Sequence, residues 1–81
     1  MKRQIEEFPK KILLANKKVY EADNLIDKED YEGAIKLYNQ YIELNPNYED
    51  AYGNRGRCYE VLGDYVKAKA DYAKADELYK S

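Results

Sequence analysis

Histidine and tryptophan are both absent from this chain of 81 residues. Histidine is the commonest general base and the commonest metal ligand in proteins, so its absence removes the usual starting point for acid–base catalysis or a zinc site. The single cysteine, Cys58, has no partner for an intrachain disulfide and fits a reducing compartment. We therefore expect neither an enzyme nor a metalloprotein, and we expect no cofactor.

Long apolar runs are missing too. No stretch approaches the roughly 18–20 apolar residues that a membrane span needs. The N-terminus carries charges at Lys2, Arg3, Glu6 and Glu7 where a secretory signal would be apolar. These absences predict a cytoplasmic location. The charge is nearly balanced, with 14 basic and 16 acidic residues, and this argues against nucleic-acid binding, which needs a basic face.

Proline and glycine are scarce, and the few present divide the chain into helical stretches. Pro9 suits the first turn of a helix, Asn45-Pro46 disfavours continuing one, and Gly63 is a natural helix end. Apolar residues recur at three- and four-residue steps between these points, and no segment alternates with period two. The pattern predicts four helices, at about 9–28, 31–44, 48–62 and 65–79, with Asp30, Asn47 and Asp64 capping the last three.

The chain matches itself when it is shifted by thirty-four residues. Asp30-Tyr31 falls on Asp64-Tyr65, and Ala34 falls on Ala68. Further matches pair Ala22 with Gly56, Leu25 with Tyr59, Tyr38 with Tyr72, and Leu44 with Leu78. Small residues, aromatic residues and a capping residue thus recur together, which predicts two copies of one helical hairpin.

A repeat of thirty-four residues that contains two helices is typical of tetratricopeptide repeats. Residues 49–81 resemble that family throughout, in Ala51-Tyr-Gly-Asn-Arg-Gly56, Leu62-Gly63-Asp64-Tyr65 and Asp71-Tyr72. Residues 15–48 resemble it less well, because Lys18 replaces a large aromatic residue and Tyr41 a small one. The resemblance implies an all-α superhelix of two repeats, 15–48 and 49–81, after an N-terminal extension or cap at 1–14.

Two helices approach closely only where one side is small. We expect five small residues to form that side: Ala22, Ala34, Gly56, Ala68 and Ala75. Tyrosine can bury its ring and leave its hydroxyl at the wet edge. We expect six tyrosines to fill the space beside the small residues: Tyr31, Tyr38, Tyr52, Tyr59, Tyr65 and Tyr72. Cys58 is expected to be a small buried apolar residue.

In the family that the chain resembles, the first helix of each repeat lines the hollow side of the superhelix. The resemblance therefore gives as candidate partner-binding residues Asn16, Val19, Asp23, Ile26, Asp27, Asp50, Gly53, Asn54, Arg57 and Val61. This face is mildly acidic, with Arg57 as its one cation, so it suits a neutral or basic peptide. The alternative is that these polar residues are only solvated. Asp23 and Asp27 alone offer too few oxygens for a hard cation.

Asn54 also matches the asparagine that fixes the ligand backbone in family members that grip the C-terminal tails of chaperones. Val19 and Asp23 stand where that carboxylate clamp needs a lysine and an asparagine. The clamp also needs basic residues from a third repeat, which this sequence does not contain. We therefore predict that the chain does not clamp the tails of the major heat-shock chaperones.

Two functions of different class follow. The first is a non-catalytic adaptor that binds a peptide or partner helix on the concave face. The alternative is a module that self-associates through the outer face of the last helix, around Tyr65, Tyr72 and Tyr79. Two repeats are fewer than the three usually needed for stability. Either the segment holding Ile5, Phe8, Ile12 and Leu13 caps the array, or the protein oligomerises, or the array is longer. The initial methionine and irregular first repeat favour a complete small protein.

Overall fold

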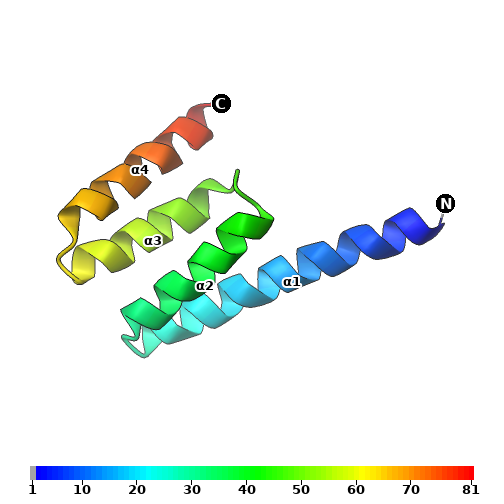
Figure 1. The fold of residues 1–81 in the computed structure, drawn as a ribbon, viewed down its shortest axis with the longest axis horizontal. Coiled ribbons are helices and arrows are strands. Elements are labelled where there is room, and N and C mark those ends of the chain that lie inside the picture. Colours follow the sequence, from blue (N-terminus) through cyan, green and yellow to red (C-terminus); the bar gives the residue numbers. More distant parts are fainter. Residues whose placement is uncertain (1) are drawn as a thin grey trace.

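A computed structural model describes the backbone of residues 2–81 and the side chains of residues 13–81. Four helices follow one another: α1 (Lys2–Asp27), α2 (Tyr31–Leu44), α3 (Glu49–Val61) and α4 (Tyr65–Lys80) (Figure 1). Residues 2–81 contain no strand. The predicted all-α fold of helical hairpins is confirmed. None of the helices described is long and apolar enough to cross a bilayer.

The observed helix bounds correct two of the predictions. Helix α1 begins at Lys2 and runs through Pro9, so the prediction that Pro9 starts it is wrong. An interior proline costs a helix about 3 kcal/mol, because it removes one hydrogen bond and its ring clashes with the preceding turn. The residues around it, Glu6, Glu7, Lys10 and Lys11, are good helix formers and favour the helix. The N-cap of α3 is Tyr48, not Asn47, and it makes no side-chain capping bond. The Asn47 N–H donates instead to Asn45 Oδ1, which holds Asn47 in the preceding turn.

The turn between the helices of each hairpin has the same construction. Asp30 Oδ1 accepts a hydrogen bond from the Gly33 N–H at 3.0 Å, and Asp64 Oδ1 accepts one from the Lys67 N–H at 3.2 Å. Both predicted caps are confirmed. The residue two positions before α2 and before α4 adopts a positive φ, +63° at Glu29 and +88° at Gly63. Gly63 is the helix end that the sequence predicts, and Glu29 takes the same conformation without the freedom of glycine.

The helices stack in chain order: α1 packs on α2, α2 on α3, and α3 on α4. Figure 1 shows this succession, with the first half of α1 extending past α2. The radius of gyration is 13.8 Å, whereas a compact domain of this length has one of about 12 Å. The molecule is therefore elongated and thin, and each helix contacts mainly its neighbours in sequence, as in a solenoid.

Small residues lie against tyrosine rings at the centre of the fold. Ala22, Ala34 and Ala68 are buried, and so is the ring of Tyr38. A Cβ added at Gly56 would lie 3.0 Å from Cε1 of Tyr72, so a larger residue would make that ring shift by a few tenths of an ångström. The predicted packing is confirmed here. The core cluster consists of Ala15, Ala22, Ala34, Ile35, Tyr38, Tyr41, Ala51 and Cys58.

Two other packing predictions have different outcomes. Tyr65 is 67% exposed, so its assignment as a gap-filling core residue is wrong. The equivalent residue of the first hairpin, Tyr31, is half-buried because α3 follows α2, whereas no helix among residues 2–81 follows α4. The predicted N-terminal cap falls mostly on Ile5, Phe8 and Ile12, which lie outside the residues whose side chains are described. Leu13 is 66% exposed.

An ion pair joins the helices of the second hairpin. Arg55 on α3 forms two hydrogen bonds to the Asp71 carboxylate on α4, at 2.8 and 2.7 Å. A further N–H of Arg55 donates to Asn39 Oδ1 on α2 at 2.8 Å. The guanidinium carbon also lies 5.5 Å from the ring centroid of Tyr52. Arg55 therefore connects three helices, and the half-buried pair fixes α4 on α3.

Candidate functional site

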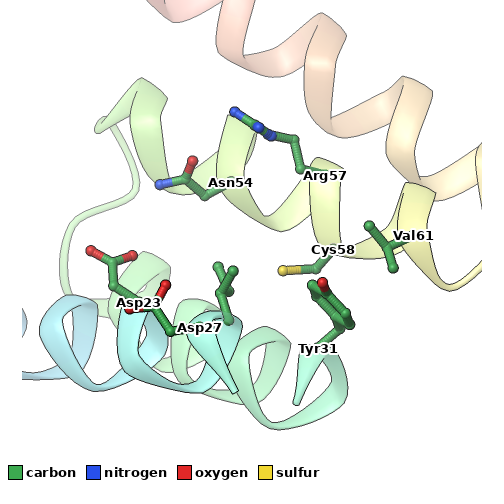
Figure 2. A pocket seen from close by; sticks show the side chains of 8 residues that line it. Asp23, Asp27, Tyr31, Asn54, Arg57, Cys58 and Val61 are labelled. Carbon is green, nitrogen blue, oxygen red and sulfur yellow. The ribbon is translucent and has the colours of Figure 1, made fainter. Parts of the chain in front are cut away.

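A cavity of about 350 Å³ opens between α1, the start of α2 and α3. Its lining consists of Asp23, Ile26, Asp27, Tyr31, Asn54, Arg57, Cys58 and Val61. Figure 2 shows Asp23 and Asp27 projecting from α1 and Asn54 projecting from α3 on the opposite wall, whereas the Arg57 side chain extends along α3 away from the two carboxylates. Tyr31 and Val61 lie together at the other end. The cavity thus has a polar end and a largely apolar end.

The polar end is anchored by a hydrogen bond from the core. The Tyr38 hydroxyl on α2 donates to Asp23 Oδ1 at 2.8 Å. The Tyr38 residue is 0% exposed. Burial, and then the neighbouring Asp23 carboxylate, raise the pKa of Tyr38 far above its ordinary value, so the hydroxyl keeps its proton and remains a donor. The position of Asp23 is therefore set by a rigid partner below it.

Asp23 and Asp27 lie one helical turn apart on the same face of α1. Like charges at this spacing destabilise a helix by about 0.2–0.5 kcal/mol. Among the side chains of residues 13–81, no ion pair involves Asp23, Asp27 or Arg57. Two carboxylates and one arginine therefore belong to the lining of the cavity without a charged partner in the described part of the chain.

The apolar end is formed by residues that also belong to the core or border it. Ile26 and Tyr31 are half-buried and pack against the core cluster, whereas Val61 is more than half exposed. Cys58 is buried, and burial raises the pKa of its thiol, although Arg57 acts in the opposite direction. The thiol is therefore a protonated apolar wall and a weak nucleophile.

The structure brings six of the candidate residues together around the cavity: Asp23, Ile26, Asp27, Asn54, Arg57 and Val61. Four others, Asn16, Val19, Asp50 and Gly53, lie outside its lining. Asn16 is exposed, Val19 packs against the core, and Asp50 accepts a hydrogen bond from the Tyr48 hydroxyl at 2.9 Å. That any of these residues binds a partner stays a prediction.

Sequence analysis did not include Tyr31 and Cys58 among the candidate site residues. Both follow the core periodicity of their helices, so the pattern assigned them to packing. Their participation depends on the packing of α2 and α3, which opens one edge of the core to the cavity. One local signal points to Tyr31: it directly follows the capping residue Asp30 and is therefore the first residue of α2.

Metal binding finds no support at this site. Where side chains are described, no group of three or more cysteine, aspartate and glutamate side chains lies close enough to hold a metal ion. Asp23 and Asp27 supply two carboxylates, fewer than the six or more oxygens that a hard cation takes. The cavity offers a hydrogen-bonding amide, charges of both signs and an apolar wall, and these suit a polypeptide segment.

The fold and the cavity define a helical-repeat protein with a hollow side. Two family models, both described as tetratricopeptide repeat, match residues 21–48 and 37–70. The chain belongs to the tetratricopeptide repeat family. The model that matches residues 37–70 begins within α2 and ends within α4, so its repeat unit does not start at the same helix as the predicted units. The predicted bounds 15–48 and 49–81 stay a prediction.

Several curated proteins are similar to this chain. Serine/threonine-protein phosphatase 5 of Homo sapiens is 43% identical over 60 residues, which cover 74% of this chain and 12% of that protein. Protein SGT1 homolog of Oryza sativa subsp. japonica is 42% identical over 50 residues, covering 62% and 14%. Hsp70-Hsp90 organizing protein of Triticum aestivum is 34% identical over 65 residues, covering 80% and 11%.

This chain therefore spans only about an eighth of the length of these relatives. The similarity is confined to a helical-repeat region that recurs in proteins with unlike names, one a phosphatase and another an organizer of two heat-shock proteins. What these relatives share with this chain is the repeat, and the activity of any whole relative does not follow from the match.

Proposed function

We propose that this chain is a non-catalytic protein-interaction domain that holds a peptide segment or a partner helix on its concave side. The observation that carries the proposal is the cavity between α1, α2 and α3, because it is lined from the first helix of both hairpins. Membership of the tetratricopeptide repeat family supports it. So does the recurrence of the repeat in Hsp70-Hsp90 organizing protein, whose name denotes the assembly of other proteins.

The charge of the cavity favours a neutral or basic partner. Asp23 and Asp27 outnumber Arg57 in its lining. An acidic tail would meet two carboxylates that have no described counter-charge, and such juxtaposition of like charges disfavours a complex. Val19 and Asp23 also occupy two positions of the carboxylate clamp with unsuitable side chains. We therefore propose a partner other than the acidic chaperone tails.

The proposal is tested with a peptide selected from a random-sequence library against the purified chain. Fluorescence polarisation of the labelled peptide gives its Kd for the parent chain and for variants. Asn54→Ala removes one amide from the cavity and is expected to weaken binding about tenfold, the loss of one good hydrogen bond. Asn24→Ala is the matched control, because Asn24 is exposed on α1 and outside the cavity lining. Equal affinity for both variants would contradict the proposal.

The outer face of α4 favours a second candidate, self-association. Tyr65 is 67% exposed, Tyr79 is 77% exposed and Val66 is 82% exposed, which is a large apolar surface for one helix. We propose a second copy of the chain as the occupant of this face. It ranks second because Lys69 and Asp76 stand where the equivalent positions of α2 carry Ile35 and Ile42, so charges interrupt the face.

Sedimentation velocity from low micromolar to near-millimolar concentration tests this second candidate. A dimer is expected to form at the upper end and to be lost in Tyr65→Lys, which places a charge at an exposed position on the same side of α4 as Tyr79. Ala70→Lys, also exposed on α4, is the matched control. A monomer at every concentration would exclude the candidate and leave the peptide-binding proposal untouched.

A further inference from the structure

The cavity combines a carboxylate end with an apolar end. Asp23 and Asp27 form the first, and Ile26, Tyr31 and Val61 form much of the second (Figure 2). Lysine and arginine have the same division within one side chain, since each carries a charged head on an apolar stem. We propose that the cavity receives one lysine or arginine side chain of the bound peptide, with its head at Asp23 and Asp27. This inference rests on the proposed function.

The hydrogen bond beneath Asp23 leaves that carboxylate a definite orientation. Tyr38 occupies Oδ1 from the core side, so Oδ2 is the oxygen left for a ligand. Asp27 lies one turn along α1 on the same wall of the cavity. A guanidinium presents several N–H groups in a plane and an ammonium presents three, so either head can donate to both carboxylates at once. Tyr38 acts here as a positioning residue.

The size of the cavity fits a single long side chain. Its volume of about 350 Å³ lies at the low end of the range of about 300–1,000 Å³ found for small-molecule pockets. The stem of the bound residue would run along Ile26 toward the apolar end, where the protonated Cys58 thiol adds a further uncharged surface. A short basic analogue would reach the carboxylates only by giving up this apolar contact.

Arg57 sets a limit on the partner. Its side chain leaves α3 and extends away from Asp23 and Asp27 (Figure 2), and no described carboxylate pairs with it. A positive charge of the peptide on the Arg57 side of the anchor would be repelled by this guanidinium, and a negative charge close to Asp23 and Asp27 would be repelled by the two carboxylates. The cavity therefore favours one basic residue beside neutral residues, and it disfavours an uninterrupted basic run.

Two random-sequence peptide libraries test the inference, one with lysine and arginine and one in which both are omitted. The first is expected to give binders that share one basic residue. Replacing that residue by an uncharged analogue, norleucine for lysine or citrulline for arginine, is expected to weaken binding by about tenfold or more, the usual scale for a charge-assisted contact. Binders of equal affinity from the second library that still require Asn54 would overturn the inference.

A double-mutant cycle locates the contact. Asp23→Asn with Asp27→Asn removes both charges, and the amide oxygen introduced at position 23 can still accept from Tyr38. This variant is expected to bind the parent peptide about tenfold more weakly and to gain nothing further from the uncharged analogue. The control, Glu43→Gln with Glu77→Gln, removes two exposed carboxylates elsewhere and is expected to keep the parent affinity. Thermal unfolding by circular dichroism verifies that every variant is folded.

The outcomes separate this inference from the proposed function. If affinity depends on Asn54 but not on the basic residue or on Asp23 and Asp27, the peptide-binding function stands and the basic anchor is wrong. If neither library gives a binder that responds to Asn54→Ala, the function and the anchor fail together. If the loss caused by the uncharged analogue disappears in the Asp23→Asn, Asp27→Asn variant, both are supported.

Discussion

The two hairpins have turns of the same construction but different interiors. α1 and α2 supply six members of the core cluster, Ala15, Ala22, Ala34, Ile35, Tyr38 and Tyr41, whereas α3 supplies two and α4 none. The buried residues of α4 are Ala68 and Asp71. The reason is position in the stack: α2 lies between α1 and α3, while α4 packs mainly on α3 among the described helices. A repeated sequence therefore sets the geometry of a hairpin, and its neighbours set how much of it is buried.

The same contrast appears in the chemistry of equivalent positions. Arg55 and Asp71 pair across the second hairpin at 2.7 Å, and their equivalents thirty-four residues earlier are Glu21 and Leu37. The first hairpin is held chiefly by apolar packing, and the second adds a half-buried ion pair. Such a pair orients two helices as well as stabilising them, because a bidentate contact has a narrow geometry.

Truncating the equivalent tyrosines is expected to give the largest difference between the hairpins. Tyr38→Ala should cost about 3–5 kcal/mol of unfolding free energy, as for other buried aromatic residues, and leave the chain largely unfolded. Tyr72→Ala should cost about 1 kcal/mol, because Tyr72 is 37% exposed and loses less apolar burial. Urea unfolding followed by circular dichroism measures both. Equal losses would show that the burial difference between the hairpins has no energetic consequence.

The ion pair gives the next largest effect. Asp71→Leu introduces the residue of the first hairpin but leaves the Arg55 guanidinium without its carboxylate, which should cost about 2 kcal/mol. Combining it with Arg55→Met removes the uncompensated charge, and the double variant should recover most of that loss. Thermal unfolding of the three chains compares them. A double variant no more stable than Asp71→Leu alone would contradict this account of the second hairpin.

Alkaline pH provides a third comparison. Burial, and then Asp23, raise the pKa of Tyr38, whereas the hydrogen bond to Glu60 is the main cause of the raised pKa of the more exposed Tyr72. Because the folded state holds these protons more tightly, their contribution is complete below about pH 10 and is lost as pH rises further. The loss at Tyr38 can reach about 1.4 kcal/mol per pH unit, and solvent screens the effect at Tyr72.

Tyr38→Phe should therefore flatten the fall in stability between about pH 10 and 11 more than Tyr72→Phe does. Urea titrations at several pH values measure the slope for the parent and both variants. Cys58 also has a raised pKa from burial, so a Cys58→Ala background separates its contribution. Identical slopes for the two phenylalanine variants would argue against a larger contribution of Tyr38 to the fall in stability at alkaline pH.

The hairpin turns should show the smallest effect. Gly63 at φ +88° has no atom within 4 Å of an added Cβ, so Gly63→Ala measures backbone strain alone. This substitution should lower the free energy of unfolding by about 1 kcal/mol. Glu29→Gly, at the equivalent turn, should raise it by a similar amount. Chemical denaturation compares the two. Changes of the same sign would show that the turns are not equivalent despite their shared hydrogen bonds.

Local chemistry made much of the fold predictable. The caps Asp30 and Asp64 and the helix end at Gly63 depend on residues within one turn of each other, so the sequence contains all the information needed. The burial of Ala22 and Ala34 follows from helical periodicity combined with the repeat. Sequence analysis placed Tyr65 both among the gap-filling tyrosines and on the outer face of the last helix. The choice between the two depends on whether another helix covers α4, and the residue itself does not determine that.

The candidate site was less predictable, since it forms across three helices. The family resemblance selected the first helix of each repeat, and six of its residues line the cavity. Periodicity assigned Tyr31 and Cys58 to the core, and residues at the boundary between core and cavity satisfy both descriptions. The Arg55–Asp71 pair was missed for a related reason: charge in a helix usually indicates a solvated face, and only the packing of α3 on α4 shows that this pair is half-buried.

The stacking of helices in chain order also bears on how the molecule folds and opens. Contacts are mostly between segments close in sequence, and such low contact order is associated with folding in microseconds to milliseconds. In a linear stack the end element can detach while the rest stays assembled. Amide hydrogens of α4 should therefore exchange before those of α2. Since α4 contributes nothing to the lining of the cavity, a molecule with α4 released would still present its cavity.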